Sequence, residues 1–461
     1  MPDAAHPATT AATVAAPSIA PRLLKVLGIA FGLAIIVGNT IGSGILRTPG
    51  DVAARLPSGA WFLGVWAAGG VYALFGAMTM AELAVMLPES GGQYVYARRA
   101  LGEYAGFVIG WTDWISCAAA VAAGSIAIGE LSGALVPALA PYGAVIAIGV
   151  TLAFTGVHWI GVRAGDLSQQ ALSVLKTAAL LAVAVACFVA PGTPASSAAT
   201  PTFPSGFLVL SALVLALQSV LYTYDGWNGV VYFGGEIRNP GREIPRAMAW
   251  GVVTVAVVYL ALNGAFLHVL GIGQLAGEKF AAAAAARSVF GATGERIVSA
   301  VMAVSILGNV NAVLMQASRV PYAMAEDGLL PRTTARVNGG GTPHVSLAAS
   351  TIVVLILVLS GTFQTVIALA AFYYVMQYAV SFTSLFVLRR REPDLPRAYR
   401  AWGYPWIPAL VWLGAVAFIV GSFVSDRTNS IRAVLVILLS FPVYLLAKRF
   451  KRAGSTVGPA N

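Results

Sequence analysis

The sequence has little charge for its length and almost no cysteine. Charged residues make up 10% of its 461 residues, whereas ordinary globular proteins contain roughly 25%. Hydrophobic residues make up 58%, and the mean hydropathy is +0.80. So few charged groups cannot cover the surface of a soluble protein of this size. The composition therefore predicts a multi-pass protein of the cell (plasma or inner) membrane.

The scarcity of reactive side chains excludes further classes of function. The two cysteines, Cys117 and Cys187, lie inside apolar runs and have neither metal-ligand nor disulfide spacing. An enzyme would need a His/Asp/Glu cluster or a nucleophile–base pair, and neither is visible. The net charge of +10 would favour nucleic acid only on a soluble basic domain. The sequence therefore predicts no enzyme, no metal, no cofactor and no nucleic acid, but a lipid bilayer as partner.

Long apolar runs are what the sequence has instead. A membrane-spanning helix needs about 20 apolar residues, so the sequence predicts an all-α integral membrane protein with 12 transmembrane helices. The ninth run is short, and a turn of two residues at 361–362 follows it. The twelve runs are 26–46, 61–87, 107–128, 142–160, 167–189, 207–232, 247–270, 297–324, 344–360, 363–388, 405–424 and 431–447.

The basic residues predict the orientation of these helices. With a cytoplasmic N-terminus, 20 of the 28 basic residues lie inside, seven lie outside and Lys176 lies within a span. Because positive residues concentrate on the cytoplasmic side, both termini are predicted to be cytoplasmic. The segments outside the spans are predicted to be a disordered tail at 1–21, a flexible outer loop at 190–205, an outer helix at 279–290 and a basic cytoplasmic tail at 448–461.

Two segments predict breaks in membrane helices. Residues 38–44 (GNTIGSG) place three glycines in the first span, and 222–228 (YTYDGWN) place a carboxylate and a glycine in the sixth. Either motif alone is also compatible with close helix packing. Spans one and six, however, begin two five-helix sets, 22–189 and 206–390, followed by two helices at 402–447. Since five is odd, the second set is inverted, and breaks at matching positions of inverted repeats indicate a transporter's substrate site.

A broken helix offers both charges of a zwitterion a partner. Free N–H groups at the start of one half attract an anion. Free carbonyls at the end of the other half attract a cation. An α-amino acid carries a carboxylate and an ammonium on one carbon, so it fits such a break.

Four stretches resemble the amino acid–polyamine–organocation (APC) superfamily of transporters. The third looks most like the L-type amino acid transporter group and its bacterial relatives. The resemblance implies the LeuT-like fold of five plus five inverted helices with helices 1 and 6 broken. The stretches are GNTIGSGILRTPG (38–50), SGGQYVYARRALGEYAGFVIGW (90–111), YTYDGWNGVVYFGGEIRNPGREIPRAM (222–248) and SRVPYAMAEDGLLP (318–331).

The resemblance also implies roles for residues of both breaks. The substrate carboxylate would meet the N–H groups of Ser43 and Gly44. The ammonium would meet carbonyls near Thr40, Tyr222 and Asp225. Tyr222 would be the aromatic gate that closes over the substrate, and Tyr224, Trp227 and Asn228 would line the side-chain pocket. The candidate substrate-binding residues are thus Thr40, Ile41, Gly42, Ser43, Gly44, Tyr222, Tyr224, Asp225, Gly226, Trp227 and Asn228.

Lys176 lies about ten residues, roughly 15 Å, from the end of the fifth span. A lysine can extend its ammonium to the membrane surface, but ionisable residues at depth generally mark function. Relatives that lack sodium dependence place a lysine where sodium-coupled cousins bind a cation, and Lys176 matches that position. The resemblance implies that its ammonium contacts carbonyls near Gly42 in place of a metal ion.

The predicted function is therefore that of a secondary active amino acid transporter working by alternating access. It would be a sodium-independent exchanger or facilitator of small, neutral L-amino acids. The alternative is a proton-coupled transporter of cationic amino acids or polyamines, and the roles of Glu82, Asp113 and Asp225 stay open. The preferred side chain and the oligomeric state stay open too. Eukaryotic L-type relatives bind a single-span partner through a disulfide after span three. The loop at 131–142 lacks cysteine, so no disulfide-linked subunit is predicted.

Overall fold

The protein is helical throughout the part of the chain that its structure, a computed structural model, describes. In this part there is no β-strand, only two isolated bridges, Leu27 with Ile237 and Ser90 with Phe233. The predicted tail at 1–21, most of the loop at 190–205 and the turn at 361–362 lie outside it. The described residues are 23–192, 207–360, 363–425 and 427–456.

Sixteen α-helices and five short 3₁₀ helices make up the described chain. They are α1 (Ile29–Thr40), α2 (Gly44–Ala53), α3 (Gly59–Met86), α4 (Gln93–Leu101), α5 (Glu103–Leu135), η1 (Pro137–Tyr142), α6 (Gly143–Ile160), α7 (Val162–Val189), α8 (Phe207–Thr223), η2 (Gly229–Tyr232), η3 (Gly234–Glu236), α9 (Pro240–Leu275), α10 (Ala281–Phe290), η4 (Gly291–Thr293), α11 (Gly294–Ala317), α12 (Arg319–Glu326), η5 (Arg332–Ala335), α13 (His344–Ser360), α14 (Phe363–Arg391), α15 (Trp406–Ser425) and α16 (Arg427–Thr456).

Several of these helices are long and apolar enough to cross a membrane. Within the described residues there are eight, or nine when the bent pair α1 and α2 counts as one span. Two further apolar helices are shorter, Ser211–Thr223 and His344–Ser360. Helix α16 continues to Thr456, into the segment at 448–461 that is predicted to be a basic tail, because Lys, Arg and Ala are strong helix formers.

The two breaks meet at the centre of the molecule. The first lies at 41–43, where α1 and α2 are bent by 50°. The second follows α8, where residues 224–228 form turns. Gly226 there has a φ of +111°, and a Cβ on it would lie 2.8 Å from the carbonyl carbon of Asn39. The backbones of the two breaks therefore touch, and only glycine fits between them.

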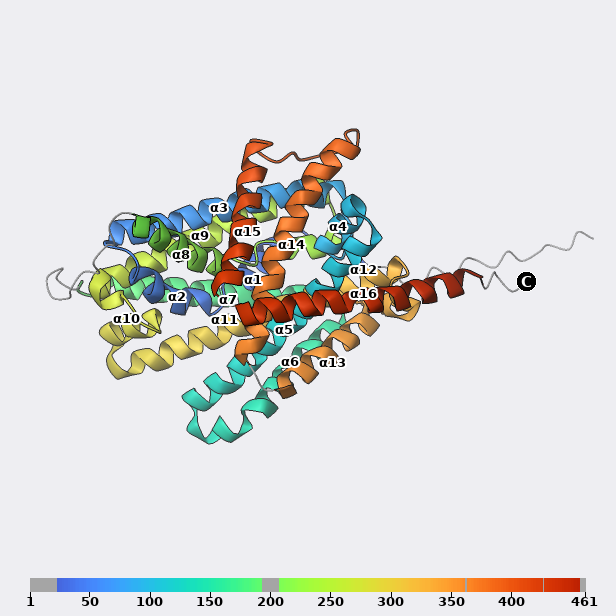
Figure 1. The fold of residues 1–461 in the computed structure, drawn as a ribbon. Helices are drawn as coiled ribbons and strands as arrows, with labels where there is room; N and C mark the ends of the chain where they lie inside the picture. Colours follow the sequence, from blue (N-terminus) through green and yellow to red (C-terminus); the bar gives the residue numbers. More distant parts are fainter. Residues whose placement is uncertain (1–22, 193–206, 361–362, 426, 457–461) are drawn as a thin grey trace, which may run out of the picture.

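The breaks are held between helices that run along the molecule. Helix α1 packs against α7, α9 and α11, and α3 packs against α9. Helices α2 and α10 lie at one end of the molecule, whereas α4, α12 and the C-terminal end of α16 lie at the other (Figure 1).

A buried ion pair ties η3 to α12 at the α4 end. The Arg319 guanidinium donates to the Glu236 carboxylate with its Nε at 3.0 Å and its Nη2 at 2.8 Å. Both side chains are fully buried, and the guanidinium also lies over the Phe233 ring. Glu82 is engaged in a similar way, because it accepts two hydrogen bonds from Arg389 at 2.8 and 2.6 Å. That pairing gives Glu82 a structural role in joining α3 to α14.

Removing Glu236 is expected to destabilise the protein by about 3–5 kcal/mol, because Glu236→Ala leaves the Arg319 charge buried and unpaired. The thermal unfolding temperature of the purified protein in detergent measures this. The control is Glu295→Ala, which breaks the exposed Arg287–Glu295 pair and should cost less than about 1 kcal/mol. Equal unfolding temperatures for both variants would contradict the expectation.

Candidate functional site

A cavity of about 190 Å³ lies where the two breaks face each other. A water needs only about 10–15 Å³ of such volume, so the cavity has room for a small molecule. Both breaks line it, together with side chains from α5, α11 and α14. Eight of the eleven predicted substrate-binding residues are brought together here, namely Thr40, Gly42, Ser43, Gly44, Tyr222, Asp225, Gly226 and Asn228.

The other three predicted residues lie outside this cavity. The side chain of Ile41 is buried in the core. Tyr224 packs between aromatic rings, with its centroid 4.9 Å from that of Tyr259. Tyr224 directly follows α8, and its N–H still donates to the Val220 carbonyl as in a helix. Residues two positions apart on a helix point about 200° apart, so Tyr224 faces away from the cavity that Tyr222 lines. Trp227 stacks on Tyr378 with ring centroids 4.8 Å apart.

Free N–H groups form one wall of the cavity. Helix α2 begins at Gly44, and the N–H groups of Ser43 and Gly44 have no hydrogen-bond acceptor among the described residues. The space beside Gly42 is open, since a Cβ there would meet no atom within 4 Å. Unpaired N–H groups at a helix start attract anions, so this wall can accept a carboxylate.

Lys176 caps the other side of the first break. Its side chain, from α7, is fully buried. Its Nζ donates to the carbonyls of Gly38 at 2.7 Å, Ile41 at 2.6 Å and Ser305 at 3.3 Å. No ion pair joins it to an acidic residue in the described part of the chain. A buried ammonium without a counter-ion is costly unless dipoles solvate it, and these three carbonyls do so while linking α7, α1 and α11.

An asparagine pair links the two breaks to α11. The Nδ2 of Asn309 donates to the Asn39 carbonyl at 2.7 Å, and the Nδ2 of Asn39 donates to the Gly226 carbonyl at 3.0 Å. The sequence reasoning missed Asn309. The sequence does mark Asn309 in one way, because a side-chain amide in the middle of the apolar run of α11 needs a buried hydrogen-bond partner.

Tyr259 of α9 joins the ends of the two broken helices. Its buried hydroxyl lies 2.9 Å from the Thr40 carbonyl and 3.0 Å from the Thr223 carbonyl. A tyrosine hydroxyl has one proton, so it can donate to only one of these carbonyls at a time. Nothing in the local sequence of α9 marks Tyr259, because tyrosine is compatible with an apolar span.

Tyr222 stands between the central cavity and a second, larger space, the vestibule. Its side chain is 46% exposed and lines both spaces. The vestibule has a volume of about 410 Å³ and is also lined by Arg47, Asp51 and Phe418. A side chain in this position can block or open the passage between the two spaces.

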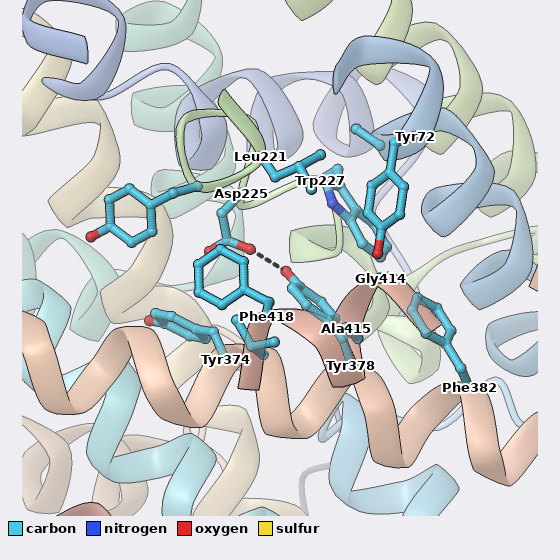
Figure 2. Close-up of a pocket in the computed structure, with 13 residues that line it drawn as sticks. Tyr72, Leu221, Asp225, Trp227, Tyr374, Tyr378, Phe382, Gly414, Ala415 and Phe418 are labelled. Carbon is cyan, nitrogen blue, oxygen red and sulfur yellow. Dashed lines mark hydrogen bonds between the residues drawn. The ribbon is translucent and has the colours of Figure 1, made fainter. Parts of the chain in front are cut away.

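Asp225 is held by a tyrosine of α14. The Tyr378 hydroxyl donates to its carboxylate at 2.5 Å, and Figure 2 shows the two groups pointing toward each other. They border a small second cavity of about 60 Å³, which Tyr72, Leu221 and Phe418 also line. Asp225 thus lines both the central and the second cavity, and its carboxylate is partnered by a hydroxyl rather than by a base.

Asp113 lies behind the central cavity rather than in it. The hydroxyl of Tyr232, which lines the cavity, donates to one carboxylate oxygen at 2.8 Å. Cys117 lies 3.7 Å from the same oxygen, whereas the other oxygen has no partner among the described residues. No group of three or more His, Cys, Asp or Glu that could hold a metal occurs in the described chain.

An all-helical, apolar chain whose broken helices enclose a small polar cavity belongs to the class of membrane transporters. Residues 23–444 match the amino acid permease family, and the chain belongs to this family, within the APC superfamily. The protein is thus a multi-pass membrane protein with the role of a transporter and not of an enzyme.

The chain is similar over nearly its whole length to characterised transporters. It is 30% identical to the serine/threonine exchanger SteT of Bacillus subtilis, over 93% of this chain and 98% of that protein. It is 28% identical to the b(0,+)-type amino acid transporter 1 of Mus musculus, over 93% and 89%. It is 27% identical to the Asc-type amino acid transporter 1 of the same species, over 92% and 81%.

Proposed function

We propose that the protein is a sodium-independent exchanger of small, neutral L-amino acids. The observation that carries this proposal is the cavity between the two breaks. It offers the free N–H groups of Ser43 and Gly44 to a carboxylate. The Asp225 carboxylate lines the same cavity and can receive an ammonium. Alternating access would move a 12-helix, five-plus-five inverted repeat around this site.

The cavity walls support a small substrate with a neutral side chain. Asp225 is the one charged residue among those that line the cavity, so a cationic side chain has no second acid to meet. Gln316 and Asn228 line the cavity too, and the Gln316 Nε2 has no partner among the described residues. That amide can donate to a side-chain hydroxyl, which agrees with the serine and threonine named for the bacterial relative. The wall from α5 is made of small residues, Ala120, Ala123, Gly124 and Ala127.

Lys176 supports sodium independence. Its ammonium donates hydrogen bonds to the carbonyls of Gly38 and Ile41 and to that of Ser305 on α11. A covalently attached cation at this position leaves no free carbonyls there for a sodium ion.

The gate proposed at Tyr222 gives a testable expectation. Tyr222→Ala removes the ring between the vestibule and the cavity, so occlusion fails. We expect the rate of exchange to fall roughly tenfold, about 1.4 kcal/mol of activation free energy. Tyr222→Phe keeps the ring and should retain at least about half of the rate. Initial rates in proteoliposomes measure both, and a Tyr222→Ala rate equal to that of the wild type would exclude a gating role.

The alternative, proton-coupled transport of a cationic amine, has one observation in its favour. The Asp113 carboxylate is buried, and one of its oxygens has no partner among the described residues. A carboxyl group of this kind can carry a proton through the transport cycle. It lies behind Tyr232 and not in the cavity, so it would couple to substrate only through that hydroxyl.

Uptake into proteoliposomes separates the two functions. The purified protein is reconstituted and supplied with labelled serine, alanine, leucine, arginine or putrescine, with and without internal amino acid and a pH gradient. Exchange predicts uptake of the small neutral amino acids that requires internal amino acid and ignores the pH gradient. Arginine or putrescine uptake driven by the pH gradient into empty liposomes would contradict the proposal and support the alternative.

A further inference from the structure

A wide groove opens at the start of α9, away from the central cavity. Its volume is about 830 Å³, and it lies between the first turns of α9, Met78 of α3 and the loop that carries Ala398 and Tyr399. Two arginines of α9, Arg242 and Arg246, line it. Neither belongs to the proposed substrate site, and nothing in alternating access requires an open basic groove here.

The two arginines are available to an anion. They lie one helical turn apart, and both are exposed. Neither side chain forms an ion pair or hydrogen bond with another residue of the described chain. Glu243, the acidic residue of the same turn, is not among the residues that line the groove. Two guanidinium groups on one face suit a phosphate, which each can bind through two N–H groups.

Tyr399 adds a further polar group to the groove. It lines the wall opposite the arginines' helix, and its hydroxyl has no hydrogen-bond partner among the described residues. Burial, together with the nearby Glu82 charge, raises the pKa of Tyr399. The hydroxyl therefore keeps its proton and is a donor that a phosphate oxygen can accept.

The same face of α9 continues into exposed apolar residues. Trp250, Val253 and Val257 follow Arg246 at four, seven and eleven positions, which is one helical stripe. They are 61%, 36% and 58% exposed. Since α9 is one of the helices fit to span the membrane, this stripe faces lipid tails. The arginines then lie at the level of the lipid headgroups, with Trp250 at the interface that tryptophan favours.

We propose that the groove binds an anionic phospholipid. Its phosphate would lie on Arg242 and Arg246, its polar headgroup against Tyr399, and its acyl chain along Trp250 and Val257. Since the apolar stripe directly below the arginines faces lipid tails, a phosphate that carries acyl chains can contact both the arginines and the stripe, whereas a soluble phosphate compound would contact the arginines alone. Basic pockets beside membrane helices bind anionic headgroups in this way.

The test measures lipid binding directly and does not depend on transport. Full-length purified protein in detergent is titrated with phosphatidylglycerol or phosphatidylcholine, and bound lipid is counted by native mass spectrometry. The variant is R242Q/R246Q. Its matched control is R332Q/R336Q, which removes two exposed arginines with the same spacing from the segment after α12. A third titration adds inorganic phosphate to the complex with phosphatidylglycerol.

The expected result is that wild type and control bind phosphatidylglycerol equally and more tightly than phosphatidylcholine. R242Q/R246Q should weaken phosphatidylglycerol binding about tenfold. The proposal is overturned if R242Q/R246Q binds phosphatidylglycerol like the wild type, or if the control loses as much affinity. It is also overturned if both lipids bind alike, or if millimolar phosphate displaces the lipid. Elution of each variant as a single size-exclusion peak, the same as that of the wild type, verifies that it is folded.

Discussion

Replacing Lys176 with methionine is expected to reduce exchange about 100-fold without unfolding the protein. Methionine keeps the length and apolar contacts of the side chain but removes the charged donor. The carbonyls of Gly38 and Ile41 then lose hydrogen bonds from a charged group, each worth about 1.5–3 kcal/mol. Loss of these hydrogen bonds is expected to distort the backbone of the first break and thereby to lower the rate of exchange. Initial rates of exchange and thermal unfolding of Lys176→Met measure the two effects.

The control for Lys176→Met is Lys279→Met, which removes a lysine that is exposed before α10. It should leave both the exchange rate and the unfolding temperature unchanged. The interpretation of Lys176 fails if Lys176→Met transports at the wild-type rate. It also fails if the loss of transport is matched by a loss of folded protein, because Lys176 would then be only a structural residue.

Gly226→Ala is expected to abolish exchange and to lower stability. Its φ of +111° disfavours any residue with a Cβ, at a cost of about 1–2 kcal/mol. In addition, the new Cβ would lie 2.8 Å from the backbone of Asn39 and 2.9 Å from the backbone of Thr40. Backbone atoms cannot rotate away as a flexible side chain can, so the two breaks must separate. Exchange rates and unfolding temperatures report the result.

Gly102→Ala is the control that separates the effect of backbone strain from the effect of contact between the two breaks. Gly102 has a similar φ of +100°, but no atom lies within 4 Å of the position of its Cβ. The substitution should therefore cost only the backbone strain, about 1–2 kcal/mol, and should leave exchange within about a factor of two. If Gly102→Ala and Gly226→Ala impaired exchange equally, contact between the breaks would not be essential.

The breaks could be predicted from the sequence because they are local. Three glycines in 38–44, and a carboxylate beside a glycine in 222–228, disturb helices that are otherwise apolar. Most of the predicted cavity residues follow one another within these two segments. Predicting the position of each break therefore also predicts which residues line the cavity. Lys176 stood out for the same reason, as one charge within an apolar run.

The remaining parts of the site depend on tertiary contacts. Tyr259 and Tyr378 bond to the breaks from α9 and α14, yet tyrosines within apolar spans look like ordinary core residues. Tyr224 does not line the central cavity, because a two-residue step reverses the direction of a side chain, which a motif does not encode. The structural role of Glu82 depends on Arg389, 307 residues away in sequence.

The central claim is that amino acids are exchanged through the cavity at the two breaks with Lys176 in place of a sodium ion. Uptake of a labelled small neutral amino acid into proteoliposomes, in sodium or in choline buffer and with or without internal amino acid, tests it most directly. The account predicts equal uptake in both buffers when the liposomes are preloaded and almost none when they are empty. Uptake into empty liposomes that requires a sodium gradient would contradict it.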